Sequence, residues 1–247
     1  MSSTDPKIEA ALPHEVPKDY RPSLNVTANL PKPNAYVLAL ENEFKDYAFS
    51  EERALHNKGK WRSDIFKVSE THPMDLEIGT GNGNHFAHYV QTHPERSLIG
   101  LELKYKPLIQ TIRRALDANC KNARIARIPG QSIDTIFNEG ELDNVYIHFP
   151  DPWVTPKKPS KRLVTRHFLS RLWKIQKPGS FIEFKTDSRE YFLWALNEIE
   201  ASQYVTLEKS LNLHQSPYAE KNFLTTFERI FMKQGIEINY IKLQKPL

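Results

Sequence analysis

Three glycines at alternate positions follow a short apolar segment that contains an acid. The segment Asp75-Leu76-Glu77-Ile78 is typical of a buried strand, and Gly79, Gly81 and Gly83 come directly after it. Glycines at such a turn let the backbone approach a ligand, and the free N–H groups at the start of the next helix suit an anion. Glu102 ends the next apolar segment about 20 residues further on, where an acid can accept from ribose hydroxyls. We therefore expect a nucleoside that carries a carboxylate or a phosphate.

The spacing of these glycines distinguishes between cofactor classes. The dinucleotide fingerprint needs its third glycine three residues after the second, and Asn84 stands there, which disfavours a nicotinamide cofactor. The spacing G-x-G-x-G, with Glu77 two residues before the first glycine, resembles the cofactor turn of class I S-adenosylmethionine-dependent methyltransferases. An ordinary tight turn between a strand and a helix remains the alternative for this segment alone.

A second acid lies between two prolines, after another apolar segment. Residues 144–149 run into Pro150-Asp151-Pro152-Trp153. Ligands of parallel α/β sheets bind outside the carboxyl ends of the strands, so we expect Asp151 to face the ligand. The prolines restrict its backbone, and Trp153 offers a flat surface on which a base can stack.

A strongly basic stretch follows this acid. Between Pro152 and Ile182 there is no acidic residue, and eight basic ones occur: Lys157, Lys158, Lys161, Arg162, Arg166, Arg171, Lys174 and Lys177. With a net charge of +4 for the whole chain, this stretch predicts a phosphate-binding surface for nucleic acid. A solvated helix face is the alternative.

The elements that must position these residues alternate between strands and helices. Apolar segments at 74–78, 97–103, 123–128, 144–149 and 181–186 are mostly followed by helical patterns, and two strand-like segments, 204–210 and 227–243, come last. The second of these is interrupted at Gln234-Gly235. This order predicts an α/β fold with a doubly wound, mostly parallel sheet.

Length and composition predict one large domain with an N-terminal extension. Residues 1–33 contain six prolines, which indicates an extended arm, and residues 34–70 are predicted to be helical, with one amphipathic helix ending before Gly59. Residues 71–247 then form the main domain. A single cysteine, Cys120, and apolar runs of at most six residues favour a cytoplasmic protein without a membrane anchor.

Four short motifs, taken in their order along the chain, narrow the resemblance from a class of methyltransferases to one family. Phe149-Pro150-Asp151-Pro152-Trp153 with Lys161-Arg162, then Lys185-Thr186-Asp187, then Thr225-Thr226-Phe227-Glu228, together resemble the tRNA (guanine-N7)-methyltransferase family, whose target is guanine 46 in the tRNA variable loop. The resemblance covers about residues 72–243 and implies S-adenosylmethionine as cofactor and tRNA as substrate.

The resemblance also implies roles for single residues. It places Glu77, the three glycines, Glu102, Gln131 and Asp151 at the cofactor, with Asp151 as the active-site acid. It places Thr155, Lys157, Lys158, Lys161, Arg162, Asp187, Thr225, Thr226, Phe227 and Glu228 at the substrate.

Three positions depart from the family pattern. Thr155 stands where a lysine is usual, with Lys157 and Lys158 as possible substitutes; Thr226 replaces a basic residue, and only Arg21 is left of an arginine-rich element. Another methyltransferase, or a catalytically weak RNA-binding protein on the same fold, therefore remains an alternative. The histidines after the glycine turn (His85, His88 and His93) lack a further ligand in the sequence, so no metal site is predicted.

Overall fold

One eight-stranded sheet runs through the molecule. The computed structural model describes residues 26–153 and 161–247. The strands follow the spatial order β1-β4-β3-β2-β5-β6-β8-β7, in which only β8 runs antiparallel to its two neighbours. Their bounds are β1 Ala48–Phe49, β2 Met74–Ile78, β3 Ser97–Leu101, β4 Ala123–Ala126, β5 Val145–His148, β6 Phe181–Thr186, β7 Val205–Ser210 and β8 Asn239–Gln244. The predicted mostly parallel sheet is confirmed.

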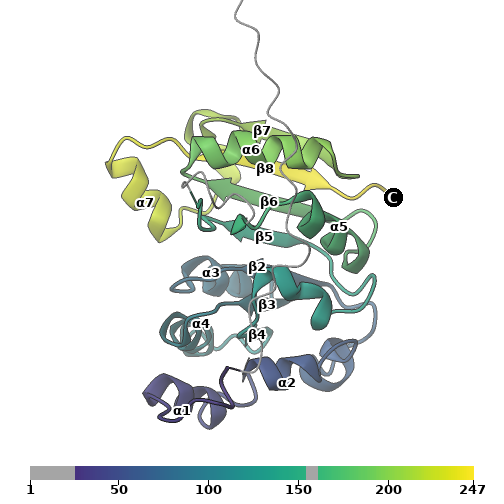
Figure 1. Ribbon diagram of the computed structural model, residues 1–247, viewed down its shortest axis with the longest axis vertical. Helices are drawn as coiled ribbons and strands as arrows, with labels where there is room; N and C mark the ends of the chain where they lie inside the picture. Colours follow the sequence, from purple (N-terminus) through teal and green to yellow (C-terminus); the bar gives the residue numbers. More distant parts are fainter. Residues whose placement is uncertain (1–25, 154–160) are drawn as a thin grey trace, which may run out of the picture.

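Helices cover both faces of the sheet. They are α1 Ala35–Glu41, α2 Glu51–Leu55, α3 Asn84–Thr92, α4 Tyr105–Asp117, α5 Arg166–Ile175, α6 Arg189–Glu200 and α7 Thr226–Lys233. Shorter helical turns are η1 Trp61–Phe66, η2 Gly130–Thr135, η4 Leu213–Gln215 and η5 Ala219–Lys221. In Figure 1 the central strands form one column, with α3 and α4 on one side and α5 on the other.

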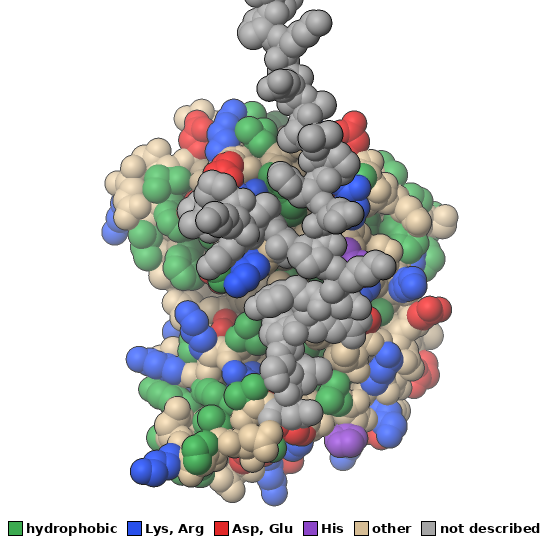
Figure 2. Space-filling model, viewed as in Figure 1, with side chains coloured by type: hydrophobic (Ala, Val, Ile, Leu, Met, Phe, Trp, Pro, Cys, Tyr) green, Lys and Arg blue, Asp and Glu red, His purple; other side chains and the backbone are tan. Residues whose placement is uncertain are grey.

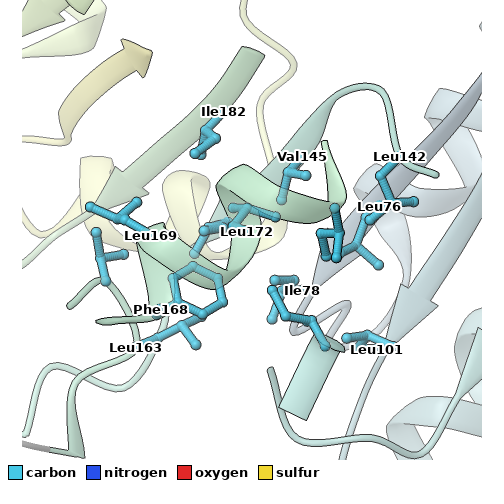
Figure 3. Packing of buried hydrophobic residues seen from close by; sticks show 14 of the residues in the cluster. Leu76, Ile78, Leu101, Leu142, Val145, Leu163, Phe168, Leu169, Leu172 and Ile182 are labelled. Carbon is cyan, nitrogen blue, oxygen red and sulfur yellow. The ribbon is translucent and has the colours of Figure 1, made fainter. Parts of the chain in front are cut away.

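The alternation of side chains along the strands divides the core into two parts. Leu76, Ile78 and Ile147 point to the face covered by α5 and α6, where Phe168 and Leu172 pack against them. Figure 3 shows this packing between α5 and the central strands. The other face buries a separate cluster that joins α1, α3 and α4 to β3 and β4. Both faces of the sheet are therefore apolar, as a doubly wound fold requires.

The segment 34–70 does not form the single helix predicted from its apolar spacing. It contains α1, the short strand β1, α2 and the π-helical turn η1. β1 pairs in parallel with β4, because the free edge of β4 offers hydrogen-bond partners that a longer helix would leave unused. Trp61 is fully buried against Phe49 and Phe137, so this segment also contributes to the main core.

The last predicted strand was wrong in its first half. Residues 227–233 belong to helix α7, and only Asn239–Gln244 forms a strand. Thr225 is the N-cap of α7 and makes a capping box with Glu228, which fixes the start of the helix. The apolar residues that suggested a strand lie on this helix instead.

Within the described residues, no helix is both long enough and apolar enough to cross a membrane.

Candidate active site

The predicted glycine turn closes one side of a cavity of about 520 Å³ at the carboxyl ends of the central strands. Gly79, Gly81 and Gly83 all have positive φ angles, and Gly83 is the N-cap of α3. A Cβ atom at Gly83 would lie 2.6 Å from Cα of Thr111, whereas one at Gly79 would meet no atom within 4 Å. Position 83 therefore needs glycine so that the turn can pack on α4. At position 79 the glycine leaves open space beside the cavity.

Glu102 lies at the end of β3 and holds the turn in place. Its carboxylate accepts hydrogen bonds from the backbone N–H of Gly81 at 3.1 Å and of Lys104 at 2.9 Å. Each carboxylate oxygen has a second lone pair, so both oxygens can still accept a hydroxyl from a ligand in the cavity. Gln131, on η2, lines the same cavity.

Asp151 lines the opposite wall, after β5. It is exposed, and it lies between Phe149 and Trp153, which have φ angles of 53° and 43°. Positive φ at two bulky residues costs about 1–3 kcal/mol each and persists only where the surroundings impose it. Phe149 packs against Phe227 and Phe231, and this packing holds its part of the loop in place. The loop is thus built to present Asp151 at the cavity.

The start of α7 forms the third wall, and it contacts the glycine turn. Thr225, Thr226 and Phe227 line the cavity, and the Thr226 hydroxyl accepts hydrogen bonds from the amide groups of Asn82 and Asn84. Phe227 is 49% exposed, so its ring is available to a ligand. The two sides of the cavity are therefore joined directly.

Glu228 and Asp187 do not line this cavity. Glu228 is fully buried, and its carboxylate accepts from the Thr225 N–H and from the Asn222 amide, both at 2.9 Å, which leaves it no exposed face. Asp187 is partly buried just after β6, and burial raises the pKa of its carboxyl above the ordinary value. The Glu228 oxygens are thus used inside the fold, and the predicted place of Glu228 at the substrate stays a prediction.

Comparisons with known proteins agree with this geometry. A family described as "Putative methyltransferase" matches residues 71–240. A tRNA (guanine-N(7)-)-methyltransferase of Bdellovibrio bacteriovorus is 57% identical over 208 residues, which cover 84% of this chain and 100% of that protein. A protein of the same description from Limosilactobacillus fermentum is 31% identical over 190 residues, with 77% and 87% covered.

This chain belongs to the tRNA (guanine-N(7)-)-methyltransferase family. Its resemblance to that family, predicted from four motifs, is confirmed. A solved structure of a SAM-dependent methyltransferase from Aquifex aeolicus superposes with a TM-score of 0.51 at 10% identity, covering 78% of this chain and 97% of that one. That likeness shows the fold, which is the predicted class I methyltransferase fold.

The basic stretch of this family member is only partly a free surface. Arg162 is buried, donates to the Pro152 carbonyl at 2.8 Å and to Glu190 at 2.5 Å, and its guanidinium lies over two aromatic rings of α6. Three other members of the stretch pair with acids elsewhere in the fold: Arg166 with Glu198, Arg171 with Asp134 and Lys177 with Asp143.

The phosphate-binding surface predicted from the eight basic residues is therefore smaller than expected, because four of them pair with acids from elements far away in the sequence. Arg162 in particular is not placed for a phosphate contact. Lys161 lines the cavity, with its ammonium 5.1 Å from the centre of the Trp153 ring. Thr155, Lys157 and Lys158 lie outside the described residues. On the face shown in Figure 2, the described Lys and Arg side chains are spread among acidic ones rather than gathered in one patch.

The three histidines after the glycine turn lie in different surroundings. His93 does follow α3 as its C-cap and His88 is exposed, but His85 is buried and hydrogen-bonds Glu77 at 2.9 Å. His148, at the end of β5, lies beside it and hydrogen-bonds Glu183 at 3.0 Å. Burial, aided by the charge of Lys185, lowers the pKa of His148 to about 3.

Sequence reasoning missed two groups of cavity residues. Asn82 and Asn84 tie the turn to α7, and their only signal was a polar side chain next to each glycine. His85 and His148 carry a clearer signal, because one follows the glycine turn and the other ends the strand before the Asp151 loop. Residues at those two places must meet when the strands lie side by side.

Proposed function

We propose that this protein transfers the methyl group of S-adenosyl-L-methionine to N7 of a guanine in tRNA, with position 46 of the variable loop as the target. The observation that carries the proposal is the single cavity that the glycine turn and Glu102 share with Asp151 and the start of α7. A nucleoside cofactor and a purine can meet there. Membership of the family and the names of the relatives supply the substrate class.

The residues present fit the cofactor. A volume of about 520 Å³ lies within the usual range for small-molecule sites. Because Gly79 has no side chain, the space beside it stays open to a ligand. The Glu102 oxygens suit ribose hydroxyls. We propose that Gln131 contacts the adenine edge and that Glu77 attracts the ammonium of the methionine part. When bound, the cofactor supplies a methyl group activated by a positive sulfur.

We assign the guanosine to the other half of the cavity. The exposed Phe227 ring gives a base a stacking surface, and Asp151 lines the same cavity. Asp187 does not line the cavity, so we place it at the edge of the guanosine site together with the Thr225 turn. Glu228 acts from inside, because it holds the α7 cap in position.

Orientation provides most of the catalysis in this scheme. Guanine N7 has an in-plane lone pair and no proton, so the reaction needs no general base. Holding N7 about 3 to 3.5 Å from the methyl carbon lowers the barrier by several kcal/mol through orientation alone. As the purine gains positive charge, its N1–H becomes a stronger donor, and a carboxylate at Asp151 that accepts from this edge stabilises the transition state.

N7 lies on an edge that the deep, narrow major groove of an RNA helix hides, so the target base must be turned outward. Lys161 lines the cavity and is our candidate for a contact to the tRNA backbone, and Lys157 and Lys158, which precede it in the sequence, are further candidates. We propose that Arg162 has a positioning role, since its hydrogen bond to the Pro152 carbonyl fastens the loop that carries Asp151.

The test is methyl transfer to two matched tRNA transcripts. One transcript carries guanosine at position 46 and the other carries adenosine there, and both are incubated with protein and S-adenosylmethionine labelled in the methyl group. We expect label only in the first transcript, and digestion to nucleosides should give 7-methylguanosine. Label of equal yield in both transcripts would refute position 46, and tight tRNA binding without label would favour an RNA-binding protein.

A further inference from the structure

Three side chains of types that bind metal ions lie close together beside the glycine turn. Glu77 comes from β2, His85 from α3 and His148 from β5, and all three line the cavity. One carboxylate oxygen and one nitrogen of each histidine lie within 4.8 Å of one another. The two imidazole rings are 4.5 Å apart, at 75° to each other. We call these three side chains the His-His-Glu cluster.

His148 has a lone pair with no use in the described structure. Its Nε2 hydrogen-bonds Glu183 at 3.0 Å, and its side chain is only 5% exposed. Its Nδ1 is buried, and no described residue donates to it. A buried acceptor without a donor costs free energy, so such an atom needs a reason. A carboxylate on one ring nitrogen is the arrangement that orients a histidine whose other nitrogen binds a metal.

The other two members of the cluster complete a donor set. His85 uses one nitrogen for Glu77, at 2.9 Å, and a neutral imidazole in that position retains one lone pair. Glu77 has a second carboxylate oxygen besides the one that His85 contacts. Two imidazole nitrogens and one carboxylate oxygen suit Zn²⁺ and related transition metals, whereas Mg²⁺ and Ca²⁺ prefer sites made of oxygen alone.

We propose that the His-His-Glu cluster binds a transition-metal ion of the Zn²⁺ class in the cofactor-free protein, with the fourth coordination position open to the cavity. Ligand atoms about 2.0–2.1 Å from a tetrahedral ion lie about 3.3 Å from each other, so the widest pair must close by roughly 1.5 Å. For this the hydrogen bond between Glu77 and His85 must open, so that both side chains face one ion. Because the proposed function places the cofactor's methionine part at Glu77, the metal and the cofactor compete for this end of the cavity.

Cobalt provides a direct test, because Co²⁺ takes the place of Zn²⁺ and its visible absorption reports coordination by nitrogen in a four-coordinate site. The full-length protein, freed of metal with a chelator, is titrated with Co²⁺ and then with Zn²⁺. We expect one equivalent of Co²⁺ to give the four-coordinate spectrum and Zn²⁺ to remove it. Absence of that spectrum up to a tenfold excess of Co²⁺ would overturn the proposal.

Variants locate the ion. His148→Gln and His85→Asn should each weaken Co²⁺ binding by at least tenfold. Loss of a residue that only hydrogen-bonds a metal ligand already lowers metal affinity by about tenfold or more, and these variants lose a ligand itself. His88→Asn is the matched control, because His88 lies on the same helix but outside the cluster, stacked on Phe223. Equal affinity in all four proteins would refute the cluster as the site. If His148→Gln fails to fold, His85→Asn decides the question.

Competition with S-adenosylhomocysteine separates this proposal from the proposed function. We expect saturating S-adenosylhomocysteine to abolish the cobalt spectrum, and a spectrum that persists with S-adenosylhomocysteine bound would overturn the shared position at Glu77. If S-adenosylhomocysteine does not bind at all while Co²⁺ does, the proposed function fails and the metal site stands.

Discussion

Replacing Glu228 with glutamine tests whether this acid supports the fold or contacts the substrate. The carboxylate is fully buried, completes the capping box of α7 and lies 3.8 Å from the ammonium of Lys185. Glutamine can still accept the Thr225 N–H, but it brings a second donor against the Asn222 amide and removes a negative charge beside Lys185.

The size of the stability loss depends on the contacts that Lys185 keeps in the variant. Removing one partner of a buried ion pair costs about 3–5 kcal/mol, and Lys185 retains Glu183 at 3.4 Å, so we expect the lower value. A loss of about 3 kcal/mol should lower the melting temperature by roughly 6–12 °C in a chain of this size. Thr225→Ala, which removes only the capping hydroxyl, should cost about 1 kcal/mol.

The assay combines denaturant unfolding with single-turnover methylation at a temperature where both variants are folded. Glu228→Gln should lose stability and keep most of its rate once folded. Stability within about 0.5 kcal/mol of the wild type, together with a rate loss of 100-fold, would contradict this reasoning and return Glu228 to the substrate site.

Three further predictions concern the cavity walls. Glu102→Ala should weaken S-adenosylhomocysteine binding by about 1.5–3 kcal/mol in calorimetry, because a charged acceptor at the ribose is lost; unchanged affinity would contradict the ribose assignment. Gly83→Ala should unfold more easily than Gly81→Ala, since a Cβ at Gly83 would lie 2.6 Å from Thr111 and one at Gly81 has 3.7 Å to its nearest neighbour; equal melting temperatures would refute the packing argument. Because burial raises the pKa of Asp187, kcat/KM for tRNA should fall on acidification at a pH above 3.8, and Asp187→Asn should lose that limb of the pH profile.

The parts of the fold that follow a strong local pattern could be predicted from the sequence. Short apolar segments that alternate with helical ones gave β2 to β6 within a few residues, because buried parallel strands need continuous apolar residues. The glycine turn, Glu102 and the Asp151 loop were placed correctly at one cavity, because the carboxyl ends of parallel strands meet at the same edge.

The remaining parts depend on partners that lie far away in the sequence. β1 is too short to be recognised, and it exists because β4 offers a free edge. α7 looked like a strand from its apolar residues, although the pattern Thr225-x-x-Glu228 is a helix-start signal that was available. The countercharges of Arg162 and its neighbours come from other elements, so charge counting along one stretch overestimated the free surface.

Single-turnover methylation by Asp151→Asn tests most directly whether cofactor and guanine meet at Asp151. With saturating tRNA and S-adenosylmethionine, we expect a rate about 100-fold or more below the wild type and little change in tRNA affinity, because the size of the side chain is kept and its charge is lost. Asp117→Asn, at the exposed end of α4, is the matched control and should react like the wild type. A rate for Asp151→Asn within about threefold of the wild type, or only about 0.65 kcal/mol, would show that Asp151 does not act at the reacting guanine.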